Sequence, residues 1–156
     1  MKRIKELCAQ ASERKNGKRA TFIGKFPPSL QDYIDKLDLV PDELLFFLTE
    51  CLPDSGFECN GVTFMTPEAI KDQIEDCEGH TLLPLGLFPF AITSSGLPVV
   101  YSVADGSISY VATPNEGDTA AELITRGPHT FEGFEAFLQI NIQKREERIR
   151  RRTEKS

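Results

Sequence analysis

Residues 81–112 read TLLPLGLFPFAITSSGLPVVYSVADGSISYVA, a series of apolar segments separated by short turn signals. From Leu97 to Val103, apolar residues alternate with smaller or polar ones, which is the side-chain period of a β-strand. Asp105-Gly106 is a turn dipeptide, and a second alternating segment follows it. This part of the chain therefore predicts neighbouring strands that pair in antiparallel fashion.

A shorter hairpin is expected before this stretch. Residues 57–59 and 62–65 are short apolar pieces, and Asn60-Gly61 between them is the dipeptide most typical of a tight hairpin turn. Thr66-Pro67-Glu68 then offers an N-cap, a proline at the first helical position and an early acid. These signals predict a helix that starts here and ends at Gly79.

Apolar residues at helical spacing predict further helices at 1–15, 29–37, 41–48 and 130–142. The first has a thin apolar face, so we expect it to dock weakly. The third has a broad apolar face made of Leu44, Leu45, Phe47 and Leu48. In the last, Thr130 is the expected N-cap and Phe131 opens the apolar face. Residues 113–129 are expected to form a loop with room for a short strand at 122–125.

The order of these elements predicts the α+β fold class. We expect a single, mostly antiparallel sheet of about five to six strands with helices packed against it. The length of 156 residues suits one hydrophobic core. We divide the chain into a basic N-terminal helix and linker at 1–28, a folded domain at 29–143, and a basic helical tail at 144–156.

Charge is segregated along the sequence. Residues 1–26 carry a net charge of +6, residues 27–143 carry −16 and residues 144–156 carry +4. An acidic body repels nucleic acid and membrane surfaces and attracts basic proteins. We therefore expect a protein partner, with no nucleic acid and no membrane, and basic ends that stay solvated or fold back on the acidic body. The charged start and the lack of a long apolar run also predict a cytoplasmic protein.

Reactive groupings are not recognisable in the sequence. Metalloprotease, serine-hydrolase, Walker and dinucleotide-binding motifs are missing, and His80 and His129 have no accompanying motif. The four cysteines have no C-x-x-C spacing, so we expect reduced thiols without a metal. The sequence thus predicts no catalytic residues, no metal and no cofactor, and a hydrolase assembled from scattered residues stays a remote alternative.

The string from Ser29 to Ile142 resembles the SUKH superfamily, the domain type of the yeast cell-wall assembly regulator and of many bacterial immunity proteins. The resemblance includes SLQDYIDKLDLVPDELLFFLTE and GVTFMTPEAIKDQ, which are similar to the opening helices and to a strand before a capped helix. It continues in LLPLGLFPFAITSSGLPVVYSVADGSISYV and ends in HTFEGFEAFLQ, which is similar to the family's terminal helix. The order and spacing of these pieces cover most of the chain.

The resemblance implies a SUKH-like domain at 29–143 that binds a protein partner. In bacteria such domains are typically immunity proteins that neutralise a toxin, often a nuclease, and an acidic surface suits a basic toxin. We expect a monomer or weak dimer that meets the toxin through carboxylates on predicted turns. These carboxylates are Asp54, Glu58, Asp105, Glu116 and Asp118.

The alternative is an intracellular scaffold or regulatory module of the same fold. It would hold a peptide in an apolar groove near Phe88, Phe90 and Tyr101. The same strand-period spacing is also that of ordinary core residues, so the sequence leaves the role of these aromatic side chains open.

Overall fold

The computed structural model describes residues 2–76, 82–112, 117–126 and 129–155. Within these residues, six strands form one sheet: β1 (Phe57–Cys59), β2 (Val62–Phe64), β3 (Leu87–Thr93), β4 (Pro98–Ser102), β5 (Ile108–Tyr110) and β6 (His129–Phe131). The strands follow one another in the sheet as they do along the chain, and each neighbouring pair is antiparallel. The α+β fold expected from the sequence is confirmed.

The hairpin turns have the chemistry that their residues predict. Asn60 and Gly61 connect β1 to β2 with φ values of 54° and 78°, as a turn with two left-handed residues requires. The resulting register places Phe57 opposite Phe64, so both rings reach the same core. Pro98 is the first residue of β4, a position where its missing N–H is tolerated.

Helices precede, interrupt and follow the sheet. They are α1 (Lys2–Ala11), the 3₁₀ helix η1 (Pro28–Leu30), α2 (Gln31–Ile34), α3 (Asp42–Glu50), α4 (Pro67–Asp76), the 3₁₀ helix η2 (Leu83–Leu85), α6 (Ala120–Arg126) and α7 (Phe134–Lys155). The predicted N-cap of α4 is confirmed, because the hydroxyl of Thr66 accepts a hydrogen bond from the backbone N–H of Ala69 at 3.2 Å.

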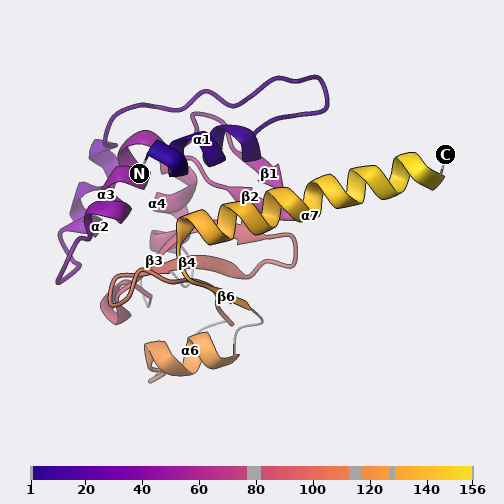
Figure 1. Ribbon diagram of the computed structural model, residues 1–156. Helices are drawn as coiled ribbons and strands as arrows, with labels where there is room; N and C mark the ends of the chain where they lie inside the picture. Colours follow the sequence, from indigo (N-terminus) through magenta and orange to yellow (C-terminus); the bar gives the residue numbers. More distant parts are fainter. Residues whose placement is uncertain (1, 77–81, 113–116, 127–128, 156) are drawn as a thin grey trace.

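The two faces of the sheet are covered by different helices. Successive residues of a strand point to opposite faces, so Leu87 and Phe88 of β3 lie on different sides. Phe88 joins the larger core with Phe137 of α7, whereas Leu87 joins a smaller core with Leu123 of α6. Figure 1 accordingly shows α1 and α7 on one side of the sheet and α6 on the other.

Stacked aromatic rings fill the larger core. The ring of Phe134 lies between Phe47 and Tyr101, with centroid distances of 4.2 and 5.1 Å and nearly parallel planes. Phe90 contacts Phe134 edge-to-face at 5.2 Å. Pairs of this kind contribute about 0.5–1.5 kcal/mol beyond the area that they bury, so α3 and α7 are tied to β4 through one stack.

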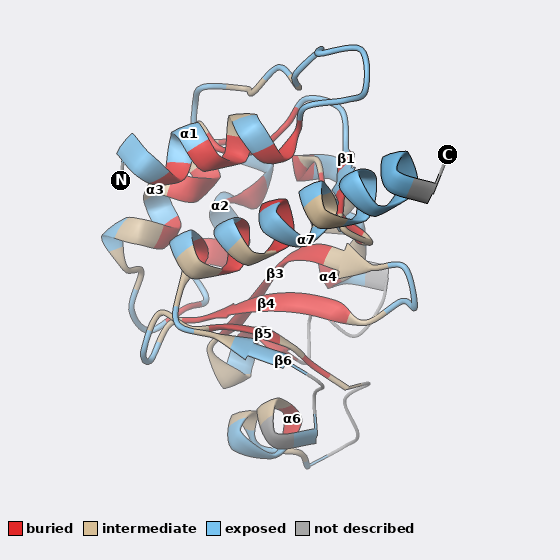
Figure 2. Ribbon diagram, turned by 45° about the vertical axis from the view of Figure 1, so that its right-hand side comes forward, coloured by how far each residue is buried: buried red, intermediate tan, exposed pale blue. Residues whose placement is uncertain are grey.

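The N-terminal helix is part of this core. Its apolar face is buried against α7 although it consists of only Ile4, Leu7, Cys8 and Ala11. Figure 2 shows the buried stripe of α1 turned toward the sheet and the exposed residues of α7 at its C-terminal end. The weak docking that the sequence led us to expect is therefore wrong, because α7 completes the surface against which α1 packs.

Boundaries differ from the prediction at α6, β6, α1 and α7. Residues 122–125, where a short strand was expected, lie in α6, whose first turn is capped by the Thr119 hydroxyl bonded to the N–H of Glu122 at 3.2 Å. Thr130 and Phe131 lie in β6 rather than at the start of the last helix, since they pair with Ser109 and Ile108 of β5. The first helix ends at Ala11, and α7 continues through residue 144 to Lys155 without a break.

Candidate functional site

The predicted partner-binding carboxylates do not converge on one surface. Asp54 and Glu58 are exposed and belong to the β1 edge of the sheet, while Asp105 is exposed in the turn between β4 and β5. Because β1 and β5 are separated by three strands at about 4.8 Å spacing, these groups cannot form one cluster. Glu116 lies outside the described residues.

Three of these carboxylates have partners within the chain, and for Glu58 the partner is the backbone N–H of Gly61. Asp105 accepts hydrogen bonds from the hydroxyl and the backbone N–H of Ser107, at 2.7 and 3.0 Å, and these bonds lower the pKa of its carboxyl group. Asp118 is paired with Arg126 at 2.6 Å, and only 7% of its side chain is exposed. The ion pair links a residue before the first turn of α6 to the last residue of that helix, and the partner contact expected for Asp118 stays a prediction.

Phe88 and Tyr101 belong to the interior. Both side chains are buried in the larger core, as is Phe90, so they form no open groove for a peptide. Burial, followed by the nearby charge of Glu43 and Asp105, raises the pKa of Tyr101 to about 12. The prediction that Phe88 and Tyr101 contact a partner is therefore wrong, because the ring stack with α7 already covers them.

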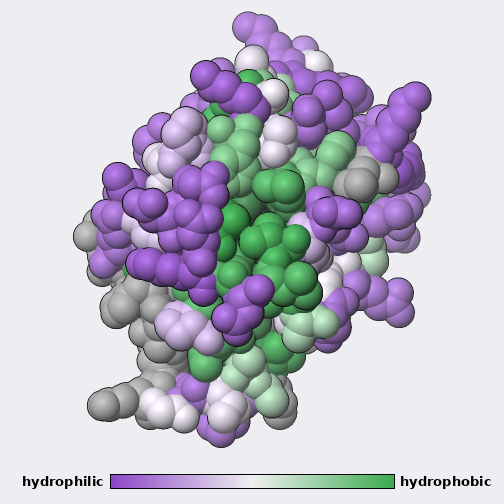
Figure 3. Space-filling view, turned by 90° about the vertical axis from the view of Figure 1, so that its left-hand side faces the viewer, coloured by the Kyte–Doolittle hydropathy of each residue, from purple (hydrophilic) through white to green (hydrophobic). Residues whose placement is uncertain are grey.

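An exposed apolar surface lies elsewhere, at the start of α3. Among the described large apolar side chains, Leu39, Leu45 and Ile149 are the exposed ones, and the first two are close together in sequence at 62% and 42% exposure. Val40 lies between them and is partly buried. Figure 3 shows hydrophobic side chains gathered on the side of the molecule that carries α2 and α3, with hydrophilic ones around them.

Carboxylates surround this apolar surface. Asp42 and Glu43 occupy the first turn of α3, where the positive end of the helix dipole favours acids. Asp38 and Asp42 are exposed, and neither they nor Glu43 form a salt bridge within the described part of the chain. We call this surface the α3 face; its residues are Asp38, Leu39, Val40, Asp42, Glu43 and Leu45.

One carboxylate oxygen of the α3 face lacks a donor. Oε1 of Glu43 is enclosed by protein and accepts no hydrogen bond from the described residues. A buried acceptor without a donor costs about 1–3 kcal/mol. This oxygen faces the interior beside Gly133, so only the remainder of the Glu43 carboxylate can contribute to the α3 face.

An apolar run in the sequence is the signal for the α3 face. Residues 44–48 are five successive apolar residues, and successive helical residues are separated by about 100° around the axis. They cannot all face the core, so Leu44, Phe47 and Leu48 are buried and Leu45 is left outside. The prediction that Leu45 belongs to the buried face is wrong for this reason.

Titratable groups typical of catalysis are not assembled in the described residues. No group of three or more His, Cys, Asp or Glu side chains there is arranged to hold a metal ion. His129 is exposed on β6 with its ring edge-to-face on Tyr110, and His80 lies outside the described residues. A hydrogen bond donated to Cys51 and burial raise the pKa of Cys8, and burial raises the pKa of Cys59 to about 11, which makes both poor nucleophiles.

The fold and the α3 face define the class of this protein as an α+β domain with an exposed apolar surface bordered by carboxylates. The chain matches no protein-family model, no curated protein and no solved structure. Among the helices that the structure describes, none is both long enough and apolar enough to cross a membrane.

Proposed function

We propose that this chain is a non-enzymatic protein-binding domain that docks a basic protein onto the α3 face. The observation that carries the proposal is the exposure of Leu39 and Leu45 beside carboxylates that have no cationic partner in the described chain. Apolar patches with polar borders are typical of protein interaction sites. Charge of one sign around such a patch favours a partner of the opposite sign.

The resemblance to the SUKH superfamily supports a narrower form of this proposal. In that form the partner is a toxin domain and the chain is the immunity protein that covers it. A nuclease toxin fits the chemistry, since a surface that holds phosphates is basic. The carboxylates of the α3 face would then occupy positions that phosphates occupy on the toxin, and Leu39 and Leu45 would supply the apolar contact.

The test uses the product of the gene adjacent to this one as the candidate toxin. Association is measured by biolayer interferometry, and protection is measured by cell survival on co-expression. The double variant Asp38→Asn with Asp42→Asn should slow association by about tenfold at low salt and flatten its salt dependence, because complementary fields accelerate encounter. The double variant Leu39→Ser with Leu45→Ser should instead speed dissociation, because lost apolar contacts act mainly on the off-rate.

The matched control removes the same charge from another helix. Glu68→Gln with Asp72→Asn changes two exposed acids of α4 and should leave both rates close to those of the unmodified protein. An equal loss in this control would show that general charge, and not the α3 face, governs binding. Failure of the adjacent gene product to bind would contradict the immunity role.

A further inference from the structure

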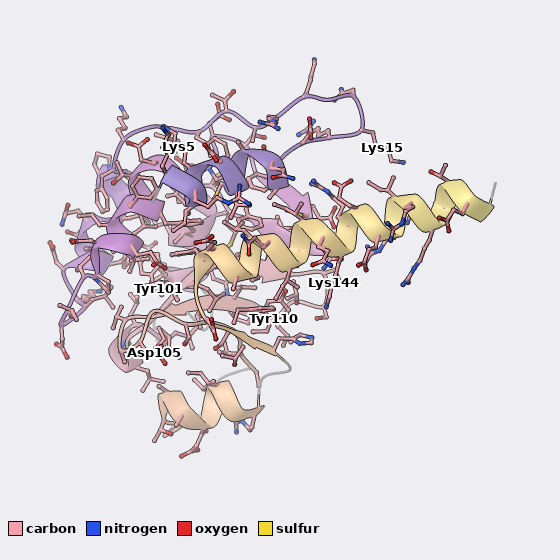
Figure 4. All side chains as sticks on the ribbon, in the orientation of Figure 1. Lys5, Lys15, Tyr101, Asp105, Tyr110 and Lys144 are labelled. Carbon is pink, nitrogen blue, oxygen red and sulfur yellow. The ribbon has the colours of Figure 1, made fainter. Side chains whose placement is uncertain are left out.

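A groove of about 780 Å³ lies between the loop that follows α1 and the C-terminal half of α7. Its walls include Arg14, Lys15, Arg145, Arg148, Ile149 and Arg152. Figure 4 shows Lys15 on the loop beside the part of α7 that lies beyond Lys144. The volume is within the range of about 300–1,000 Å³ that is usual for small-ligand sites. The two basic ends of the sequence thus form one surface.

Two of the three carboxylates of the groove are paired with arginines. Glu13, Glu58 and Glu146 line it. Glu13 pairs with Arg19 at 3.8 Å, and Glu146 pairs with Arg145 at 3.1 Å. Glu58 accepts a hydrogen bond from the backbone of the β1–β2 turn. Glu58 keeps its negative charge, and the lining of the groove therefore holds five cations against three carboxylates.

Three cations of the groove lack a carboxylate partner within the described residues. Arg14 and Lys15 are exposed and form no ion pair there. Arg148 donates a hydrogen bond to the neutral side-chain oxygen of Asn60 at 2.9 Å, which orients the guanidinium group without neutralising it. The groove consequently has a local excess of positive charge in a protein whose net charge is −6.

One wall of the groove is helical. Arg145, Arg148 and Arg152 follow one another at spacings of three and four residues, so they lie along one side of α7. Figure 1 places this end of α7 on the opposite side of the molecule from α3, so the acidic α3 face is too distant to neutralise it at ordinary salt.

We infer that this groove binds a phosphate-bearing anion, whose phosphate groups contact Arg14, Lys15 and Arg148. A phosphate group carries up to about two negative charges and three acceptor oxygens. A ligand with two or three phosphates can therefore neutralise three cations within this volume, and planar guanidinium groups bind phosphate in bidentate fashion. Ile149, which is 42% exposed in the wall of the groove, offers an apolar contact for a base or sugar. Free nucleotides and the backbone of a nucleic-acid strand share this chemistry.

Binding is tested on the full-length protein with tripolyphosphate, ATP and a single-stranded octanucleotide, by calorimetry and fluorescence anisotropy. At least one of these probes should bind. The double variant Arg14→Glu with Lys15→Glu should weaken it by about tenfold or more, because two charge-assisted contacts become repulsive. Arg148→Gln should weaken it as well and should make the salt dependence shallower, because fewer counterions are displaced. The probe that binds most tightly shows whether the natural ligand is an inorganic polyphosphate, a nucleotide or a nucleic-acid strand.

The matched control is Lys2→Glu with Lys25→Glu, which reverses two exposed charges that do not line the groove. The inference is overturned if none of the probes binds, if the control weakens binding as much as the groove variants do, or if poly-glutamate of equal charge binds as tightly as the best probe. Affinity for the basic protein partner should be unaffected by the groove variants, since the α3 face is elsewhere. Failure of one proposal therefore leaves the other standing.

Discussion

Arg145 links the two ends of the chain by side-chain hydrogen bonds, in addition to the apolar packing of α1 on α7. Its guanidinium group donates hydrogen bonds to the backbone oxygens of Ala11 at 2.8 Å and Gln10 at 3.1 Å, at the end of α1. Carbonyl groups in the last turn of a helix have no partner within the helix, and a cation there also suits the helix dipole. Arg145 thus provides the C-terminal cap of α1 from 134 positions further along the chain.

Replacing Arg145 should therefore destabilise the fold and not only alter the surface charge. Arg145→Ala should lower the free energy of unfolding by about 1–3 kcal/mol, since two carbonyl groups lose a charged donor. Arg145→Lys should recover only part of this loss, because an ammonium group lacks the planar fork that reaches both oxygens. Urea denaturation followed by circular dichroism gives the values. The exposed Arg150→Ala is the control, and a cost equal to that of Arg145→Ala would contradict the capping role.

Single residues also show how far the site could be predicted from sequence. The exposure of Asp54, Glu58 and Asp105 follows from their positions in or beside turns. The burial of Tyr101 does not, because strand alternation separates two faces but does not say which face a helix will cover. That information depends on Phe134, which is 33 positions away and stacks on the tyrosine ring at 5.1 Å.

At the scale of elements, α1 adds more to the core than its short apolar face suggests. Leu7 is buried, α1 packs against α7, and residues of α3 belong to the same core cluster. Leu7→Ala should lower the free energy of unfolding by about 2–5 kcal/mol, the usual cost of truncating a fully buried leucine. Leu39→Ala removes the same atoms from an exposed position and should change it by no more than about 0.5 kcal/mol.

Thermal and urea unfolding of the two variants provide the comparison. A cost for Leu7→Ala as small as that for Leu39→Ala would mean that α1 is detachable from the core. A large cost for Leu39→Ala would mean that this leucine is held by the fold, and the α3 face would lose its apolar contact.

The hairpins could be predicted from sequence because their signals are local. Asn60-Gly61 and Asp105-Gly106 specify turns by their own backbone preferences, and the strands beside them follow. The segment 119–131 could not be predicted in the same way. Thr119 and Thr130 are both plausible N-caps, and only the pairing of β6 with β5 decides that Thr130 lies in a strand. The pairing of β6 with β5, a contact between segments distant in sequence, therefore determines a secondary structure that the local sequence does not specify.

At the scale of the whole molecule, the fold separates the charges of the sequence into a basic surface and an acidic surface. The basic segments at the two ends of the chain meet along the groove beside α7, while the α3 face carries unpaired carboxylates on the opposite side. The net charge of −6 is the sum over the whole chain and does not give the local charge of either surface. A partner that contacts one of these surfaces interacts mainly with the charges of that surface, because charges further away than about 10 Å are screened at 0.1 M salt.

Because the protein has one basic and one acidic surface, we expect it to bind both anion-exchange and cation-exchange resins. At pH 7 and low salt it should be retained by a quaternary-ammonium resin and, despite its net charge of −6, also by a sulfonate resin.

Two double variants with the same net charge separate the position of the cations from their number. They are Arg14→Glu with Lys15→Glu and Lys2→Glu with Lys25→Glu, in which each substitution exchanges a cation for an anion. The first pair should abolish retention on sulfonate, whereas the second should largely preserve it, because retention depends on where the cations lie and not on their sum. Elution salt concentration is the measurement. Flow-through of the unmodified protein on sulfonate, or equal loss in both pairs, would show that the basic ends do not act as one surface.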